Sequence, residues 1–219
     1  MLVQALVLAL ATTSTASEAT TAAPIVVPAV LSAGPYRYTF DGTFWNGVKR
    51  SLSADELVTR RAGTVDIRVS RDDGPDREAT PQERAPYEEI ARVFGAGPSA
   101  FGVGSRWHTE LAVQIGETIN ETTSVPLDVR VIRTDANGTL VQASGNAHAM
   151  QSGGGYRSPV DLTIRVAALV NGGTIVRYDS DTTEDVHAGP FSQQLHWRWS
   201  IAKAEREILQ PNEQRLPHN

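Results

Sequence analysis

The sequence predicts a mainly β protein, an antiparallel meander that forms a barrel or a two-layer sandwich with one inserted α-helix. Between residues 105 and 202, five successive segments alternate apolar and polar residues at the two-residue period of a half-buried strand. The turns between several of them contain Asn and Gly, which tolerate the positive φ of hairpin turns. A segment at about residues 80–94 has the end signals and spacing of an amphipathic helix.

Residues 160–168 show the strand alternation most clearly. Val160, Leu162 and Ile164 lie on one face, and Asp161 and Thr163 lie on the other. The same rule holds in four other segments, at residues 106–115, 125–133, 140–150 and 195–201. A sheet with one apolar face has to bury that face, either by closing on itself or by packing on a second layer. Barrel and sandwich are therefore both open at this point.

The helix prediction depends on its first turn. Thr80 and Glu83 have the spacing of a capping box, and Pro81 suits the first helical position. Pro86 has no backbone N–H, so one hydrogen bond of the second turn is missing. A second possibility is therefore that the regular helix begins only at Pro86. Gly95 is the expected end of the helix.

The composition divides the chain into four segments. Residues 2–11 are apolar and residues 12–23 are mostly small, so residues 1–23 are expected to be a signal peptide. The Pro-rich residues 24–35 are a linker or an edge strand, residues 36–203 are a single β-rich domain, and residues 204–219 are a polar C-terminal tail. The location expected from this reading is secreted or periplasmic.

Composition also limits the partners. The net charge of −5 and the lack of a basic stripe give no reason to expect nucleic acid, and the apolar run is too short for a transmembrane span. The chain has no Cys, no phosphate-binding or dinucleotide-binding glycine motif and no serine-hydrolase motif, so no cofactor and no catalytic residue is assigned.

Two groups of polar residues offer metal-ligand chemistry. His108 and Glu110 are two residues apart, so their side chains point to the same face of a strand. They would form a metal site only if His148 and His196 lie close to them. The acidic residues 179–185 are expected to form a solvated loop, with calcium binding as the less favoured alternative. No residue is assigned as a metal ligand.

The remaining signal is aromatic, because large aromatic residues and small alanines both occupy apolar strand faces. This pattern suits a pocket for a small hydrophobic or lipid-like ligand in a non-enzymatic binding module. Two alternatives stay open: a structural or protein-interaction module of the cell envelope, with an envelope protein as its partner, and a metal- or carboxylate-dependent enzyme. The expected ligand-binding residues are Trp107, Leu111, Ala143, Ala147, Trp197 and Trp199.

Overall fold

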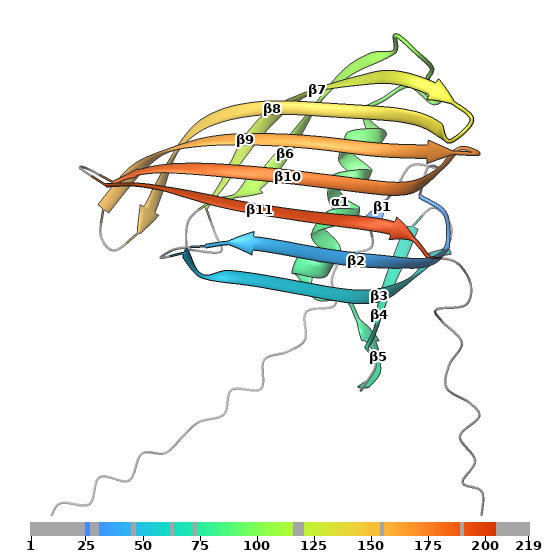
Figure 1. Cartoon of the computed structure of the whole chain (residues 1–219), viewed down its shortest axis with the longest axis horizontal. Helices are drawn as coiled ribbons and strands as arrows, with labels where there is room; N and C mark the ends of the chain where they lie inside the picture. Colours follow the sequence, from blue (N-terminus) through green and yellow to red (C-terminus); the bar gives the residue numbers. More distant parts are fainter. Residues whose placement is uncertain are drawn as a thin grey trace, which may run out of the picture.

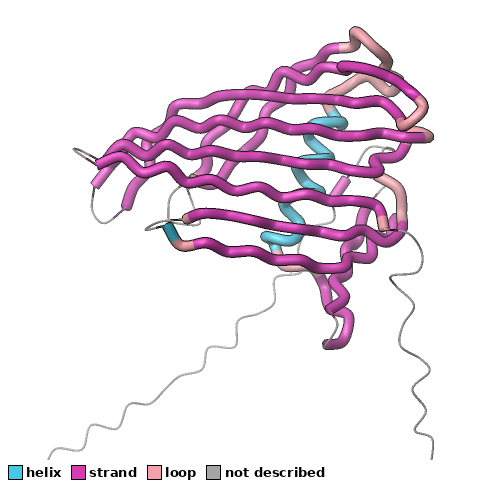
Figure 2. Tube along the Cα trace, viewed as in Figure 1, coloured by secondary structure: helices cyan, strands magenta, loops and turns pink. Residues whose placement is uncertain are grey.

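A computed structural model describes residues 25–26, 31–44, 47–61, 64–71, 74–115, 121–153, 156–188 and 191–204. The expected signal peptide at residues 1–23 lies outside the described residues, as does the C-terminal tail apart from Ala204. Strands make up most of the described chain, and one long helix crosses behind them (Figure 2).

The elements follow one another in a simple order. The first five strands are β1 (Ile25–Val26), β2 (Gly34–Thr43), β3 (Lys49–Arg61), β4 (Thr64–Arg71) and β5 (Gly74–Glu78). The helix α1 (Pro81–Gly95) comes next. Six longer strands complete the chain: β6 (Arg106–Gln114), β7 (Thr122–Asp135), β8 (Gly138–Gly153), β9 (Tyr156–Asn171), β10 (Thr174–Ala188) and β11 (Phe191–Lys203).

All eleven strands belong to one sheet, and they pair antiparallel. The strand order is β1-β4-β3-β2-β11-β10-β9-β8-β7-β6, with β5 paired to β4. Within the described residues no pairing joins β6 to β1, so the sheet does not close into a barrel. The predicted antiparallel meander with one inserted helix is confirmed.

The sheet curves around α1, so that its concave face turns toward the helix (Figure 1). Burial alternates along the strands as the sequence predicts: Val125, Leu127 and Val129 of β7 are buried, whereas Asp128 and Arg130 are exposed. The buried residues of this face and of α1 form a single apolar cluster. Antiparallel pairing permits this arrangement, because one face can be solvated while the other packs on a core.

The first turn of α1 is closed as predicted. The Thr80 side chain accepts a hydrogen bond from the Glu83 backbone, and the Glu83 carboxylate accepts one from the Thr80 backbone at 2.8 Å. Arg77 adds a bidentate pair to the same carboxylate, with nitrogen–oxygen distances of 2.8 and 2.6 Å. These bonds fix the start of the helix, which therefore begins at Pro81 and continues through Pro86 instead of starting there.

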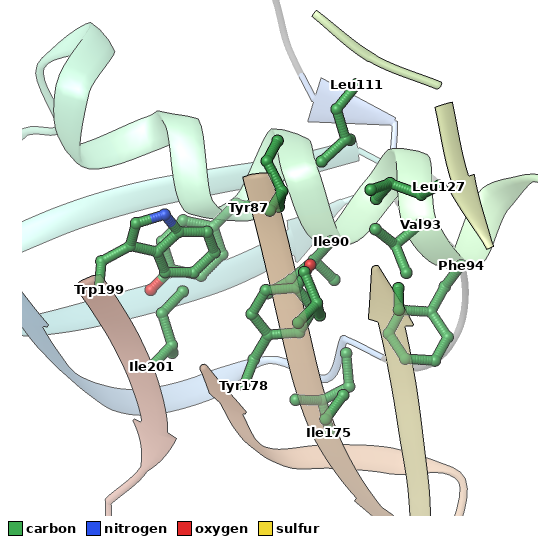
Figure 3. Packing of buried hydrophobic residues seen from close by; sticks show 14 of the residues in the cluster. Tyr87, Ile90, Val93, Phe94, Leu111, Leu127, Ile175, Tyr178, Trp199 and Ile201 are labelled. Carbon is green, nitrogen blue, oxygen red and sulfur yellow. The ribbon is translucent and has the colours of Figure 1, made fainter. Parts of the chain in front are cut away.

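The helix packs with its apolar side toward the sheet. Ile90, Val93 and Phe94 lie in the same cluster as Tyr178 and Ile175 of β10 (Figure 3). At the opposite side of the cluster, Trp107 of β6 donates its indole N–H to the Val93 carbonyl at 2.7 Å. The Gly97 N–H bonds to the Phe94 carbonyl and not to that of Val93, so the Trp107 indole supplies a partner for a carbonyl of the last turn of α1 and anchors β6 there.

One glycine permits the closest approach of two strands. A Cβ built at Gly145 of β8 would overlap the Pro126 carbonyl oxygen of β7 and lie 2.7 Å from the Leu127 side chain. Because the neighbouring atom is backbone, a side chain here would displace one strand from the other.

Gly145→Ala is therefore expected to lower the free energy of unfolding by more than about 2 kcal/mol, measured by urea denaturation. Gly95→Ala is the matched control, since no atom lies within 4 Å of a Cβ at that position. It should cause no loss of stability. A Gly145→Ala variant as stable as the parent would show that β7 and β8 are farther apart at this point than described.

Candidate functional site

The six residues predicted to bind a ligand all lie on the concave face. Leu111 of β6 and Ala143 of β8 are buried, as are Trp107 and Trp199, whereas Ala147 and Trp197 are only half-buried. The strand register places Trp107, Ala143 and Trp199 in one row across the sheet, through Val129, Val166 and Ser180.

The two buried tryptophans belong to different aromatic groups. Trp107 contacts Phe94 and Phe101, with ring centroids 6.3 and 5.7 Å apart. Trp199 stacks on Tyr178 at 5.2 Å, with 15° between the ring planes. Trp107 bonds to the Val93 carbonyl of α1, and Tyr178, on which Trp199 stacks, bonds to Glu89 of α1. These two tryptophans are therefore part of the core between the helix and the sheet.

The two half-buried residues, Ala147 and Trp197, pack against the buried apolar cluster without being part of it. Trp197 pairs across strands with Gly42 of β2, and the Phe40 and Phe44 rings stack 6.1 Å apart over this glycine. A Cβ at Gly42 would meet Phe44 at 2.9 Å and Phe40 at 3.0 Å, so the rings need glycine there. We call Phe40, Phe44 and Trp197 the aromatic rim; all three are partly exposed.

A line of buried polar residues runs along β10 beside this rim. Ser180, Thr182 and Glu184 are 1 %, 4 % and 2 % exposed, and we call them the polar stripe. They occupy the alternate positions that elsewhere on the concave face hold Val, Ile and Leu. Of these residues, only Glu184 was considered from the sequence, within the acidic segment weighed for calcium; Ser180, Thr182, Phe40 and Phe44 were not predicted as part of a site.

The prediction of a solvated acidic loop at residues 179–185 is wrong, because these residues are part of β10. Asp179, Asp181 and Asp185 lie on the convex face, opposite the stripe. They bond there to neighbouring side chains, respectively Arg177 and Arg198, His196, and Gln194. Only Glu184 of this acidic segment turns inward.

A second buried carboxyl group, Glu56 of β3, connects the sheet to the helix. It is fully buried, and the Tyr87 hydroxyl of α1 donates a hydrogen bond to its Oε2 atom. The Oε1 atom is buried without a hydrogen-bond partner among the described residues. Burial raises the pKa of Glu56 to about 8, although the Tyr87 bond acts to lower it. Glu56 is therefore protonated at neutral pH.

Glu89 makes a matching contact on the β10 side of the helix. The Tyr178 hydroxyl donates to its Oε1 atom at 2.9 Å. Burial raises the pKa of Glu89 to about 7, against the lowering effect of the nearby Ser180 and Tyr178 hydroxyls. Of these two hydroxyls, only that of Tyr178 has hydrogen-bonding geometry, because the Ser180 Oγ atom has no partner among the described residues.

Glu83 shows the opposite behaviour at the start of the helix. Burial alone would raise the pKa of its carboxyl group, but the bonds from Arg77 and Thr80 lower it to about 2. Where the helix packs on the sheet, the pKa of Glu83 is thus lowered, whereas the pKa values of Glu56 and Glu89 are raised.

The structure does not bring His108, Glu110, His148 and His196 together. Each histidine faces solvent on the convex side next to its own aspartate: His108 beside Asp128, His148 beside Asp161, and His196 beside Asp181. Glu110 accepts a hydrogen bond from the Ser124 hydroxyl at 2.8 Å. Among the described residues, no group of three or more His, Cys, Asp or Glu side chains is placed to hold a metal ion.

Comparison with known proteins identified no relative: no family model, no curated protein and no solved structure matches the chain significantly. In the described part of the chain, no helix has the length and apolar composition needed to cross a bilayer. Functional inference therefore depends on the concave face itself.

The buried Glu56 carboxyl group makes stability depend on pH. Below pH 4.5 it is protonated in both folded and unfolded chains; between pH 4.5 and 8 only the unfolded chain releases the proton, so the free energy of unfolding falls as pH rises. At about 1.4 kcal/mol per pKa unit, the fall from this group is up to about 5 kcal/mol.

Glu56→Gln is expected to reduce this dependence and to leave the smaller fall below about pH 7 that Glu89 contributes, measured as the free energy of unfolding from pH 5 to 8.5. Glu110→Gln, an exposed carboxylate on the convex side of β6, is the control and should retain the full slope. Equal slopes for both variants would contradict a proton-binding role of Glu56.

Proposed function

We propose that this chain is a non-enzymatic binding module that acts outside the cytoplasm, in a secreted or periplasmic setting. Its concave sheet face and its helix together enclose a small hydrophobic or lipid-like ligand. The observation that carries the proposal is the aromatic rim, where three large aromatic side chains remain partly exposed at the border of a well-buried core.

The rim differs from the rest of the concave face in its exposure. Where α1 packs on the sheet, Tyr87 and Ile90 of the helix and Tyr36 and Tyr178 of the strands are completely buried. Trp197 is only half-buried, and so are Ala147 and Ala149 of β8. Incomplete burial of apolar groups beside a core is typical of a surface that a ligand or partner covers.

Additional apolar surface continues the rim along the neighbouring strand. Leu52 of β3 pairs across strands with Phe40 and is exposed, and Val48 next to the rim is exposed as well. The Arg50 guanidinium lies 5.4 Å from the centroid of the Phe44 ring, so it covers part of that ring. Together these side chains offer a ligand an apolar approach to the concave face.

The export part of the proposal is supported by the apolar run and the small residues at positions 2–23. Intact mass of the protein purified from its native cells is the direct measurement. Loss of 16 to 23 residues from the amino terminus is the expected result, by the processing rule for signal peptides.

Binding is tested with an uncharged apolar fluorophore, N-phenyl-1-naphthylamine, titrated into the purified protein. We expect saturable binding with one site per chain. Trp197→Ala and Phe44→Ala should each weaken binding about fivefold or more, as loss of an aromatic contact does at other binding surfaces.

Ile132→Ala is the matched control, because Ile132 is an exposed apolar side chain of β7 that lies away from the rim. It should leave the affinity unchanged. Absence of saturable binding by the parent protein, or equal effects of all three variants, would overturn the proposed function.

A further inference from the structure

Arg50 of β3 is a charged side chain on the concave face of the sheet. The strand register places it in one row with the aromatic rim, because Trp197 pairs with Gly42 and Gly42 pairs with Arg50. Alternation along β3 leads to the same face, since the buried residues Ala54 and Glu56 lie at even positions as Arg50 does. The positive charge therefore lies beside the rim.

Arg50 differs from the other charged residues of this face in its exposure. At the described concave positions of β3 and β10, the charged side chains are Arg50, Glu56 and Glu184. Glu56 is fully buried and Glu184 is 2 % exposed, whereas Arg50 is exposed. A molecule that reaches the rim from solvent therefore meets the positive charge and neither of the two carboxyl groups.

The guanidinium group of Arg50 is held near the rim with its hydrogen-bond donors unused. Its central carbon lies over the Phe44 ring, 5.4 Å from the ring centroid. Among the residues that the structure describes, no carboxylate or carbonyl group accepts a hydrogen bond from this guanidinium. The contact with the ring is electrostatic, so the five N–H donors of the group stay available to an acceptor.

Exposed apolar side chains border Arg50 on both sides along the chain. Leu52 lies two positions further along β3, shares the concave face and is exposed. On the other side, Val48 is exposed, and its carbonyl accepts a hydrogen bond from the Phe44 backbone at 2.7 Å. A cation next to exposed apolar groups matches a molecule with an apolar body and a negative head. Guanidinium groups bind carboxylate and phosphate groups through pairs of parallel N–H···O bonds.

We propose that Arg50 binds a negatively charged head group of the ligand, a carboxylate or a phosphate, while the apolar part of the ligand lies on the aromatic rim. The inference rests on the proposed function and specifies its ligand class: an anionic amphiphile, in preference to a cationic one. The net charge of the chain is −5, which favours cations at long range, so a preference for anions has to come from local contacts.

The experiment is displacement of bound N-phenyl-1-naphthylamine at pH 7 by three ligands with the same ten-carbon chain: decanoate, monodecyl phosphate and decylamine. Decanoate, monodecyl phosphate or both should displace the probe at a roughly fivefold lower concentration than decylamine, the upper range for an ion pair exposed to water. Comparison of the two anions distinguishes a carboxylate head from a phosphate head.

Two variants assign the preference to Arg50. Arg50→Gln should reduce the preference for the anions at least about threefold. Lys49→Gln removes the same charge from the preceding residue, whose side chain lies on the opposite face of β3, and should leave the preference unchanged. Each preference is a ratio of two displacement concentrations for one variant, so a change in probe affinity cancels.

The two proposals fail in different ways. If the probe binds and decylamine displaces it as well as the anions do, the apolar site stands and the head-group inference is overturned. If the probe does not bind, both are overturned. Equal effects of Arg50→Gln and Lys49→Gln would also overturn the inference, because overall charge and not Arg50 would then set the preference.

Discussion

The packing of α1 into the concave face is the contact on which the rest of the structure depends. A single curved sheet leaves an apolar face that has to be buried, and the helix buries it. Three polar contacts fix its position: the Trp107 indole on the Val93 carbonyl, the Tyr87 hydroxyl on Glu56, and the Tyr178 hydroxyl on Glu89. They reach three different strands, so the helix also determines how far the sheet can open.

Two of these contacts use carboxyl groups that burial keeps protonated near neutral pH. A neutral carboxyl group tolerates apolar surroundings far better than a carboxylate does, so Glu56 fits a core position that would otherwise exclude it. Polar side chains under the helix thus have tyrosine partners, whereas Ser180, on the same strand as Tyr178, has none among the described residues.

Much of the fold could be predicted from the sequence, because alternation and turn residues act locally. Val160, Leu162 and Ile164 identify their strand, and Thr80 with Glu83 identifies the start of the helix. The polar stripe could not be predicted, because its inward residues Ser180, Thr182 and Glu184 are polar like their outward neighbours. Residues 179–185 therefore show no alternation of apolar and polar residues, although they belong to a strand. Phe40 and Phe44 were missed because their pairing depends on Gly42 and on β11, which is distant in sequence.

The pairing of β2 with β11 has a consequence for how the protein folds. It joins residues such as Thr39 and Ser200, whose side chains are 2.7 Å apart although 161 positions separate them in the chain. Every other pairing along the strand path connects segments much closer in sequence, within either the β1–β5 group or the β6–β11 meander. Contacts of such long range form late, since the entropy of closing the loop has to be met first. Phe40 and Phe44 come from one side of this junction and Trp197 from the other, so the aromatic rim exists only once this junction has formed. A chain that is still being synthesised cannot assemble the rim before β11 has emerged and can pair with β2.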